Sequence, residues 1–306
     1  MIDTFASFNA RTATLEQRGE LTLLRVDNAH AHALIALQGA QVLEFQAHQQ
    51  RPLLWLSESA EFRRGQSVRG GVPVCWPWFG ALDRNPVDVQ AMTRGEDLPA
   101  HGFVRNATWT LEAVTEHAER TTVMLKYATV ATIQPEWPHN ATLRLAIGVG
   151  KTLSLELSTR NEQHEPLAIT QALHTYLPVS DIRAVEIRGL DTARYIDTLD
   201  DWQPHSQHGA VAFSGETDRI YLDTPARIEL FDRNWQRTLV LHTRNSNSAV
   251  VWNPWIDKAK RLSQFGDEDW QRMLCIETAN VLDDRVLLKP GAEHVLEVEI
   301  GEAHPI

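Results

Sequence analysis

The sequence predicts an all-β protein, a large antiparallel β-sandwich with few short helices. Three observations lead to this prediction. Short apolar runs with period-2 alternation recur along the chain, turn residues separate them at fairly regular spacing, and segments with helical periodicity are scarce. Many short strands at such spacing are typical of an antiparallel sandwich. The 306 residues show no linker-like change in composition and no repeat, so we expect a single domain over residues 1–306.

Strand-like runs begin near the N-terminus and continue to the C-terminus. A hairpin is predicted around residues 148–151, because a Gly-Val-Gly-Lys segment there separates two alternating runs. The candidate strands cover residues 21–26, 33–37, 42–45, 108–114, 122–127, 142–147, 153–158, 167–179, 185–189, 194–197, 227–231, 237–243, 248–252, 273–281 and 294–300. The two helix candidates, residues 262–272 and 13–18, are short and charged.

Composition limits the kinds of partner that the protein can have. An apolar fraction of 43% is enough for a large core. The net charge is −11, from 29 basic and 40 acidic residues, and no basic block interrupts it, so neither nucleic acid nor an anionic membrane is an expected partner. An anionic ligand would have to be held by a few local arginines.

The two cysteines and the N-terminus indicate the compartment. Cys75 and Cys275 are too few for a disulfide framework and are interpreted as buried thiols in a reducing compartment. Residues 1–5 show no basic or apolar leader signal, and no apolar run reaches membrane-spanning length. We therefore expect a soluble, cytoplasmic protein.

Two segments, residues 67–80 and 98–106, are neither strands nor ordinary loops. Both are dense in Gly, Pro and aromatic residues, and their charged side chains include Arg69 and Arg105. They are too apolar for solvated connectors and are interpreted as walls of a cleft. A guanidinium beside a tight turn suits the capture of phosphate or carboxylate, whereas an ordinary surface salt bridge is the alternative for each arginine.

The most informative strand, residues 273–281, is apolar except for one carboxylate at its centre, Glu277. Burying an ionised carboxylate is costly unless it is paired or has a chemical role. Pairing with an arginine is the structural alternative. Because the rest of the strand offers no reason to tolerate a charge, we interpret Glu277 as a functional residue.

The strand-like run over residues 167–179 contains one histidine, His174. Strand alternation places Thr170, Ala172 and Tyr176 on the same face as His174, and these small or polar neighbours suggest the floor of a ligand site. A core histidine with its hydrogen bonds satisfied is an equal alternative for this residue alone. If the fold brings His174 and Glu277 together, they form a general acid/base pair.

Other candidate features are weaker. Asp218 could bind a hydroxyl group, but a turn residue is the preferred interpretation from its surroundings. The ten tryptophans could stack on sugars, although a core position is the better expectation for each. The His30-Ala31-His32 segment has no third ligand nearby, and nucleotide-binding motifs are absent, so we expect no metal and no cofactor.

Six segments in a fixed order resemble a known family. They are residues 69–74, 99–106, 172–176, 218–221, 251–255 and 275–277. Together they are similar to the hexose-6-phosphate mutarotases (glucose-6-phosphate 1-epimerases) of the aldose 1-epimerase superfamily, which have a galactose-mutarotase-like fold. No single segment is diagnostic, but the ordered set is specific and spans residues 69 to about 281.

The resemblance implies an isomerase that interconverts the α and β anomers of a hexose 6-phosphate. It implies that His174 is the general acid and Glu277 the general base. Arg69 and Arg105 resemble the phosphate-side arginines, and the resemblance implies that His101 and Asp218 contact the substrate. Attraction between the acid and the base is expected to favour an imidazolium facing a carboxylate. The expected partner is a sugar phosphate, and the expected state is a monomer.

One position departs from the family, which leaves the preferred sugar open. The family often has Gln before the His-Gly-Phe motif, where this chain has Ala100. A mutarotase of unphosphorylated aldoses is one alternative, and a non-catalytic sensor of sugar phosphates is another. A glycosidase is less favoured, because such enzymes typically use two carboxylates.

Overall fold

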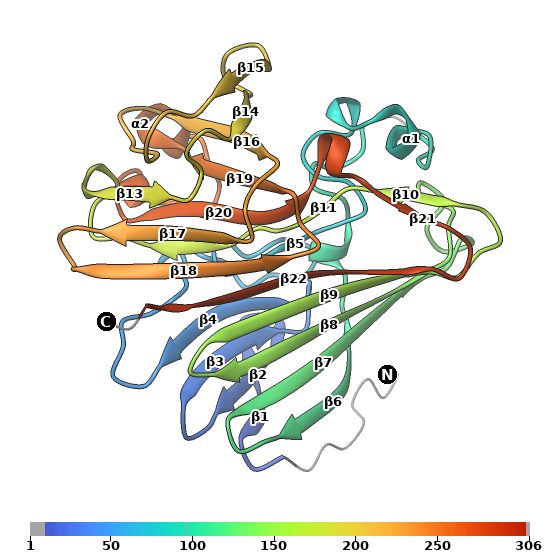
Figure 1. Cartoon of the computed structure of the whole chain (residues 1–306). Coiled ribbons are helices and arrows are strands. Elements are labelled where there is room, and N and C mark those ends of the chain that lie inside the picture. Colours follow the sequence, from blue (N-terminus) through green and yellow to red (C-terminus); the bar gives the residue numbers. More distant parts are fainter. Residues whose placement is uncertain (1–9, 96, 304–306) are drawn as a thin grey trace.

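The computed structural model describes residues 10–95 and 97–303. It confirms the all-β prediction, because antiparallel sheets dominate and the two α-helices in this part of the chain are short, α1 (Val87–Gln90) and α2 (Trp255–Ala259) (Figure 1). Residues 1–5, on which the expectation about a leader rests, lie outside the described residues. No helix within the described ranges is long and apolar enough to cross a membrane.

Two eight-stranded antiparallel sheets form most of the fold. We call them the cleft sheet and the long sheet. The cleft sheet has the order β15-β14-β16-β19-β20-β11-β5, with β12 also paired to β20. Its strands are β5 (Val74–Cys75), β11 (Gln171–Leu173), β12 (Tyr176–Pro178), β14 (Arg194–Asp197), β15 (Gln203–Ser206), β16 (Thr217–Leu222), β19 (Ser248–Asn253) and β20 (Met273–Asn280).

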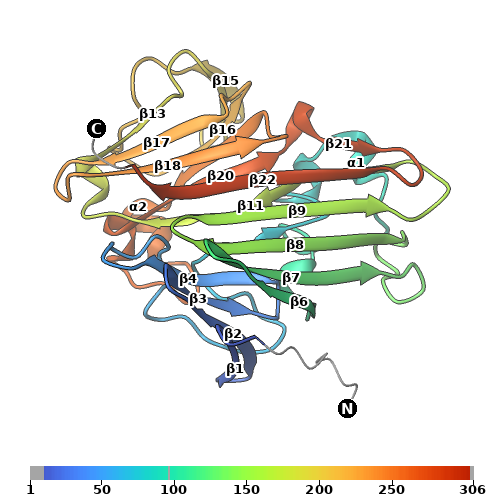
Figure 2. The same cartoon turned by 60° about the horizontal axis from the view of Figure 1, so that its bottom comes forward.

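The long sheet has the order β13-β17-β18-β22-β9-β8-β7-β6. Its strands are β6 (Thr110–Glu116), β7 (Arg120–Thr129), β8 (Ala141–Gly150), β9 (Leu153–Asn161), β13 (Val185–Arg188), β17 (Arg227–Asp232), β18 (Arg237–Arg244) and β22 (Glu293–Glu302). Figure 2 shows β22, β9, β8 and β7 side by side across it. The predicted hairpin joins β8 to β9, but β8 extends through Gly150 and the turn falls at residues 151–152.

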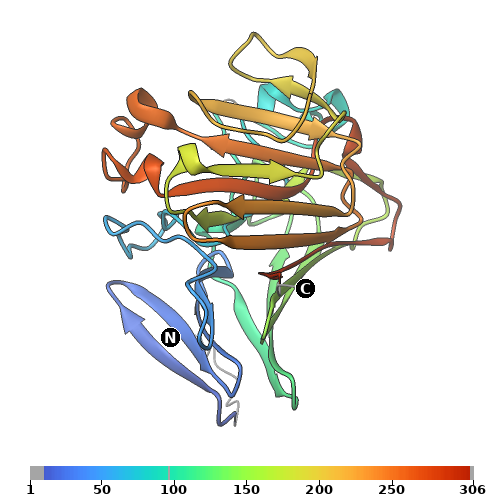
Figure 3. The same cartoon turned by 60° about the vertical axis from the view of Figure 1, so that its left-hand side comes forward.

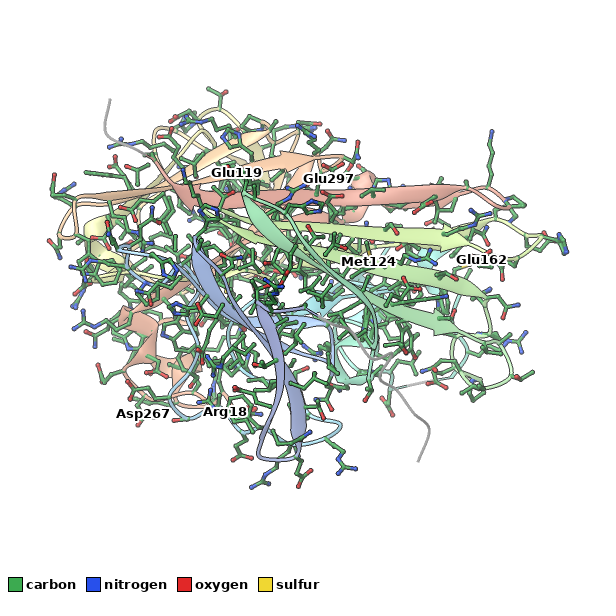
Figure 4. The ribbon with its side chains drawn as sticks, turned by 90° about the horizontal axis from the view of Figure 1, so that it is seen from below. Arg18, Glu119, Met124, Glu162, Asp267 and Glu297 are labelled. Atoms are coloured by element: carbon green, nitrogen blue, oxygen red, sulfur yellow. The ribbon has the colours of Figure 1, made fainter. Side chains whose placement is uncertain are left out.

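A smaller N-terminal sheet and a strand pair complete the sheets. The N-terminal sheet contains β1 (Ala13–Arg18), β2 (Leu21–Asp27), β3 (Ala31–Ala36) and β4 (Gln41–Ala47), and the pair is β10 (Leu167–Ile169) with β21 (Val286–Leu288). Figure 3 shows the blue N-terminal sheet below the orange and red strands of the two large sheets. Strand β3 contacts β8, and the view from below shows Arg18 on the N-terminal sheet beside the long sheet with Met124 on β7 (Figure 4).

The main core combines residues from all three sheets. A single apolar cluster includes Ile35 of β3, Leu155 of β9 and Ile276 of β20, each at most 1% exposed. Trp76 and Trp78 belong to the same cluster and are fully buried, as expected for tryptophans in a sandwich. The loop that carries them is therefore anchored in the core, which fixes the neighbouring residues of the cleft wall.

The two predicted helices are wrong. Residues 13–18 form β1, an edge strand whose six residues all pair with β2. Residues 262–272 contain only a short 3₁₀ turn, Asp269–Gln271. Gln264 has a left-handed backbone conformation, with φ of 56°, and the Asp269 carboxylate accepts a hydrogen bond from the Gly266 amide at 2.8 Å. This local turn replaces the backbone hydrogen bonds that a helix would need.

Candidate active site

A cavity of about 540 Å³ lies on the face of the cleft sheet that points away from the main core. We call it the main cavity. Its floor comes from three neighbouring strands, β16, β19 and β20, through Ile220, Val250 and Glu277 among others. Strand pairing places Ile220 opposite Val250 and Val250 opposite Glu277, so these side chains form one row across the sheet.

Strand β20 carries Glu277 into this floor. All eight residues of β20 are buried, because one face of the strand covers the core and the other lies under the cavity. This double burial explains the nearly continuous apolar run seen in the sequence. The Glu277 side chain is only 2% exposed, and its Oε2 atom has no hydrogen-bond partner among the described residues.

His174 lies between β11 and β12, where the paired strand is interrupted. Leu173 pairs with Thr278 and Tyr176 pairs with Cys275, so the register continues across the two residues between them. In that register His174 stands opposite Glu277 on the same face of the sheet. On its other side, the His174 amide donates to the carbonyl of Pro73 at 3.0 Å, which extends the pairing of β11 with β5 by one residue.

The structure brings His174 and Glu277 together. His174 Nε2 lies 3.3 Å from Glu277 Oε1, and the histidine side chain is 12% exposed. Burial raises the pKa of Glu277 well above its usual value, and the charge of Asp218 adds to the effect. Burial lowers the pKa of His174 well below its usual value, and the neighbouring His101 and the charges of Arg69 and Arg105 act in the same direction.

These shifts correct the expected charge state of the pair. Attraction was expected to favour an imidazolium facing a carboxylate, but the loss of hydration on burial favours neutral His174 facing a protonated Glu277. The two states contain the same number of protons. They differ only in whether one proton lies on Nε2 or on Oε1, so the pair can move a proton without exchange with solvent.

His101 lies at the same cavity, with its ring centroid 5.8 Å from that of His174. Burial, together with the charges of Arg105 and Arg69, lowers the pKa of His101 to about 3, so the ring is neutral near pH 7. The Gly80 amide donates to His101 Nδ1 at 3.2 Å, which places the ring hydrogen on Nε2. His101 is therefore a fixed hydrogen-bond donor rather than a titrating group.

A second cavity of about 330 Å³ adjoins the first at His101, His174 and Tyr176. We call it the side cavity. Arg69 and Arg105 both line it, and Arg69 lines the main cavity as well. The remaining walls are mostly polar and come from residues 66–68, 73, 106, 263 and 264. The two arginines that the sequence singled out are thus brought to one polar space beside the acid/base pair.

A sharp turn fixes Arg69. The next two residues are glycines with positive φ, and a Cβ atom on Gly71 would overlap the carbonyl oxygen of Val42. Only glycine allows the backbone to pass this close to β4. Arg69 Nη1 then donates to the Tyr176 hydroxyl at 3.3 Å.

Arg105 lies in the short 3₁₀ turn Val104–Asn106 and donates from Nη2 to the carbonyl of Ala100 at 3.0 Å. Its Nε atom is buried without a hydrogen-bond partner among the described residues. None of the ion pairs within residues 10–95 and 97–303 involves Arg69 or Arg105. Two guanidinium groups without a carboxylate partner make the side cavity suitable for an anion.

Asp218 lines the main cavity, but the interpretation of it as a turn residue is wrong. It belongs to β16, where it pairs with Trp252 of β19. Burial raises the pKa of Asp218, and the nearby charge of Lys258 opposes that shift. The Lys258 ammonium lies 3.9 Å from the Asp218 carboxylate and 3.2 Å from that of Glu216. A half-buried carboxylate beside a cation is well placed to accept a hydrogen bond from a hydroxyl group.

Two cavity residues were missed by the sequence analysis. Trp252 belongs to the main core, as expected, but it also lines the main cavity with its ring 6.2 Å from that of His174. Lys258 comes from α2, and no local pattern marks it. Tyr176, which the sequence placed on the same strand face as His174, lines both cavities and stacks on that histidine. Cys75 and Cys275 are buried free thiols, as expected, and burial raises the pKa of each.

Metal-ligand geometry is not a feature of this site. Within the described ranges, no three His, Cys, Asp or Glu side chains are grouped so that they could hold a metal ion. The ionisable groups that line the two cavities instead comprise one acid/base pair, one neutral histidine, one carboxylate with a lysine, one tyrosine and three arginines: Arg69, Arg84 and Arg105.

Comparison with known proteins shows the family. The profile of the family described as aldose 1-epimerase matches residues 22–301. The chain belongs to the aldose 1-epimerase family. It is therefore an isomerase that epimerises aldoses at the anomeric carbon.

Relatives of this aldose 1-epimerase cover nearly its whole length. A protein of Escherichia coli K12, named as a candidate glucose-6-phosphate 1-epimerase, is 33% identical over 279 residues, which are 91% of this chain and 90% of the relative. A protein of Cenchrus ciliaris with the same name is 34% identical over 271 residues, which are 85% of this chain and 78% of the relative.

Solved structures confirm the fold of the epimerase. The crystal structure of a candidate mutarotase from Salmonella typhimurium matches with a TM-score of 0.87 and 30% identity, covering 97% of this chain and 95% of the other. A galactose mutarotase-like protein from Clostridium acetobutylicum matches with a TM-score of 0.72 at 15% identity, covering 96% of this chain and 98% of the other. The galactose-mutarotase-like fold expected from the sequence is thereby confirmed.

Proposed function

We propose that this aldose 1-epimerase interconverts the α and β anomers of a hexose 6-phosphate, with D-glucose 6-phosphate as the expected substrate. The observation that carries the proposal is the side cavity, where Arg69 and Arg105 line a polar space and neither forms an ion pair with a described carboxylate. This space adjoins His174, whose Nε2 lies 3.3 Å from Glu277. A sugar at the acid/base pair could thus place a phosphate between the two arginines.

In the proposed reaction, Glu277 removes the proton from the anomeric hydroxyl while His174 protonates the ring oxygen. The C1–O5 bond breaks and an open-chain aldehyde forms. Both oxygens are bonded to C1, so the acid and the base must be neighbours, and the 3.3 Å separation of the pair meets this requirement. Each positioned proton transfer is typically worth ~10²–10⁴-fold in rate.

The state of the pair after ring opening is the one that burial favours. Glu277 then carries the proton and His174 is neutral, which is the direction of both pKa shifts. Rotation about C1–C2 presents the other face of the aldehyde. Reclosure with the roles reversed returns the proton to His174 and gives the other anomer, so protons balance without a cofactor.

Two further residues are proposed to orient the sugar. His101 offers a fixed Nε2–H donor, because its Nδ1 accepts the Gly80 amide. Asp218 offers a carboxylate on the floor of the main cavity, beside Lys258. A donor and an acceptor on different walls would hold hydroxyl groups on different sides of the ring.

The names of the relatives support glucose 6-phosphate as the substrate, since those from Escherichia coli and Cenchrus ciliaris both refer to it. Ala100 departs from the Gln common in hexose-6-phosphate mutarotases, and a hydrogen bond from that position to the substrate is therefore missing or supplied by another residue. We propose that the fixed donor of the adjacent His101 supplies it.

The test compares phosphorylated and free sugar in the double variant Arg69→Ala/Arg105→Ala. Because hydrogen bonds to charged groups contribute about 1.5–3 kcal/mol each, kcat/KM for glucose 6-phosphate should fall about 10²-fold or more. The rate with glucose should fall less than about tenfold. The matched control is Arg64→Ala/Arg233→Ala, which removes two exposed arginines outside both cavities.

Equal losses for the two sugars would favour a mutarotase of unphosphorylated aldoses. Binding of glucose 6-phosphate without any acceleration of anomer exchange would favour the sensor. Either result would overturn the proposed substrate or the proposed reaction.

A further inference from the structure

Tyr176 connects the side cavity to the acid/base pair, and the mechanism above gives it no role. It lines both cavities and is 3% exposed. Its hydroxyl accepts a hydrogen bond from Arg69 Nη1 at 3.3 Å. Its ring lies parallel to the imidazole of His174, with the centroids 4.8 Å apart and an interplanar angle of 9°. One side chain therefore contacts both a guanidinium of the side cavity and the proposed general acid.

The backbone of Tyr176 is tied to the same turn that positions Arg69. Its amide donates to the carbonyl of Gly71 at 2.9 Å, and its carbonyl accepts from the amide of Trp55 at 3.0 Å. The indole of Trp55 is nearly parallel to the phenol ring, with an interplanar angle of 23°. The turn, the phenol and the imidazole are thus one packed unit, so a change at Arg69 reaches His174 through direct contacts.

The charges around His174 show what an anion would change. The ionisable groups that face it are Glu277 from β20, His101 and Arg105 from the loop over residues 99–106, Arg69 from the glycine turn, and the Tyr176 phenol. The cations Arg69 and Arg105 lower the pKa of His174. A dianion bound between them would oppose this effect and favour the imidazolium.

The phenol can take part in such binding. Burial raises the pKa of Tyr176, so the group keeps its hydrogen near pH 7. Its oxygen already accepts from Arg69, which leaves the O–H free to donate to an anion in the side cavity. A cation is also stabilised by the face of an aromatic ring, and the Tyr176 ring lies against the imidazole that must become positive.

We propose that Tyr176 is a positioning residue that couples occupation of the side cavity by the substrate's phosphate to the general acid His174. The phosphate fixes Arg69 and the phenol, and the stacked ring then holds the imidazole toward Glu277 in its protonated form. The phosphate acts in this way as an activator of the acid as well as a binding group. This inference rests on the proposed function, because it places the phosphate in the side cavity.

The experiment supplies the sugar and a phosphate-like anion as two separate molecules. Anomer exchange of glucose is measured with increasing inorganic phosphite, and the rate that phosphite alone gives without protein is subtracted. The wild type should be accelerated saturably, by about tenfold, a size usual for coupled sites. Tyr176→Phe keeps the ring and removes the hydroxyl, and its acceleration should be less than about threefold. Tyr127→Phe is the matched control, since Tyr127 lies on β7 outside both cavities.

A second measurement needs no variant. The ¹⁵N signals of the His174 ring are followed against pH with and without phosphite, and phosphite should raise the pKa of His174. A merely structural tyrosine would not change this titration, so the shift should be smaller in Tyr176→Phe and unchanged in Tyr127→Phe.

The outcomes distinguish this inference from the proposed function. Equal phosphite activation in wild type and Tyr176→Phe would overturn the role of Tyr176. A wild type that prefers glucose 6-phosphate to glucose, but shows neither phosphite activation nor a shifted His174 titration, would overturn the coupling and leave the proposed function standing. A wild type with no preference for the phosphorylated sugar would overturn both.

Discussion

At the scale of single residues, burial sets the protonation of the proposed catalytic pair. Glu277 and His174 lie in contact under a cavity, and loss of hydration shifts their pKa values in opposite directions, toward the neutral forms. The pair then holds one proton between His174 Nε2 and Glu277 Oε1, which lie 3.3 Å apart. The reaction needs only proton transfers between these two residues and the sugar. Such opposed shifts are frequent where one residue acts as acid and another as base.

The shared proton predicts a bell-shaped pH–rate profile. Activity requires one proton on the pair, so a second proton stops it at low pH and loss of the first stops it at high pH. Since the pKa of His174 is lowered, the acidic limb should lie below the usual range of histidine; since that of Glu277 is raised, the basic limb should lie above the usual range of glutamate.

The profile is measured as kcat/KM for glucose 6-phosphate. Each single variant should lose the limb of the group that it removes, so Glu277→Gln should lack the basic limb and His174→Asn the acidic limb. A flat profile in active wild type, with proton transfer shown to be rate-limiting, would contradict the assignment of the pair.

The same burial predicts that Glu277 destabilises the fold. The pKa of Glu277 is higher in the folded protein than in the unfolded chain. Its contribution to stability is therefore fully present below the unfolded pKa and is lost as pH rises through the folded pKa. Glutamine does not titrate, so Glu277→Gln loses no stability over this pH range. It should therefore unfold at a higher temperature than the wild type near pH 8, by about 2 °C or about 1 kcal/mol, with the difference vanishing below about pH 4.

Thermal unfolding of both proteins across this pH range checks the sign. A variant that is less stable than the wild type at pH 8, or a difference independent of pH, would show that Glu277 is a structural group rather than one retained at a cost in stability.

At the scale of elements, the strands were largely predictable and the cavity walls were not. The strand β20 could be read from its apolar run and its central glutamate. The pairing of His174 with Glu277 depends on a strand register over about a hundred residues of sequence separation, which no local pattern contains. The helix predicted over residues 262–272 is wrong because Gln264 and Gly266 form a turn that the Asp269 side chain caps. Such a turn competes with a helix for the same backbone, and helical periodicity in the sequence does not reveal it.

The walls of the cleft are fixed at points where one backbone segment passes very close to another. Gly102 has φ of 70°, and a Cβ atom there would overlap the carbonyl oxygen of Trp76. Gly102→Ala should therefore destabilise the protein by about 3 kcal/mol or more and displace the neighbouring His101. Gly65→Ala is the matched control, because Gly65 has φ of 74° and open space around its Cβ position, so only about 1 kcal/mol of backbone strain is expected.

Urea unfolding of the two variants measures this difference. Similar losses of stability in both would mean that the left-handed backbone, rather than the contact with Trp76, makes glycine necessary at residue 102.

At the scale of the whole molecule, the fold class and the family followed from the sequence, whereas the shape of the site did not. A net charge of −11 disfavours anions overall, yet the fold collects two arginines without ion-pair partners among the described residues into one small cavity. Residues 69, 105, 174 and 277 come from four separate segments, so only the folded chain shows that they line two adjoining cavities. That the chain forms one domain stays a prediction, which the shared core of the three sheets supports.

The most direct test concerns the proposed interconversion of the anomers of glucose 6-phosphate with Glu277 as the base. Magnetisation-transfer NMR measures that exchange directly, in wild type, Glu277→Gln and the control Glu299→Gln, which changes an exposed glutamate on β22. We expect exchange well above the spontaneous rate in wild type and control, and a fall of about 10²–10⁴-fold in Glu277→Gln. Equal acceleration by folded Glu277→Gln, or none by folded wild type, would contradict the proposal.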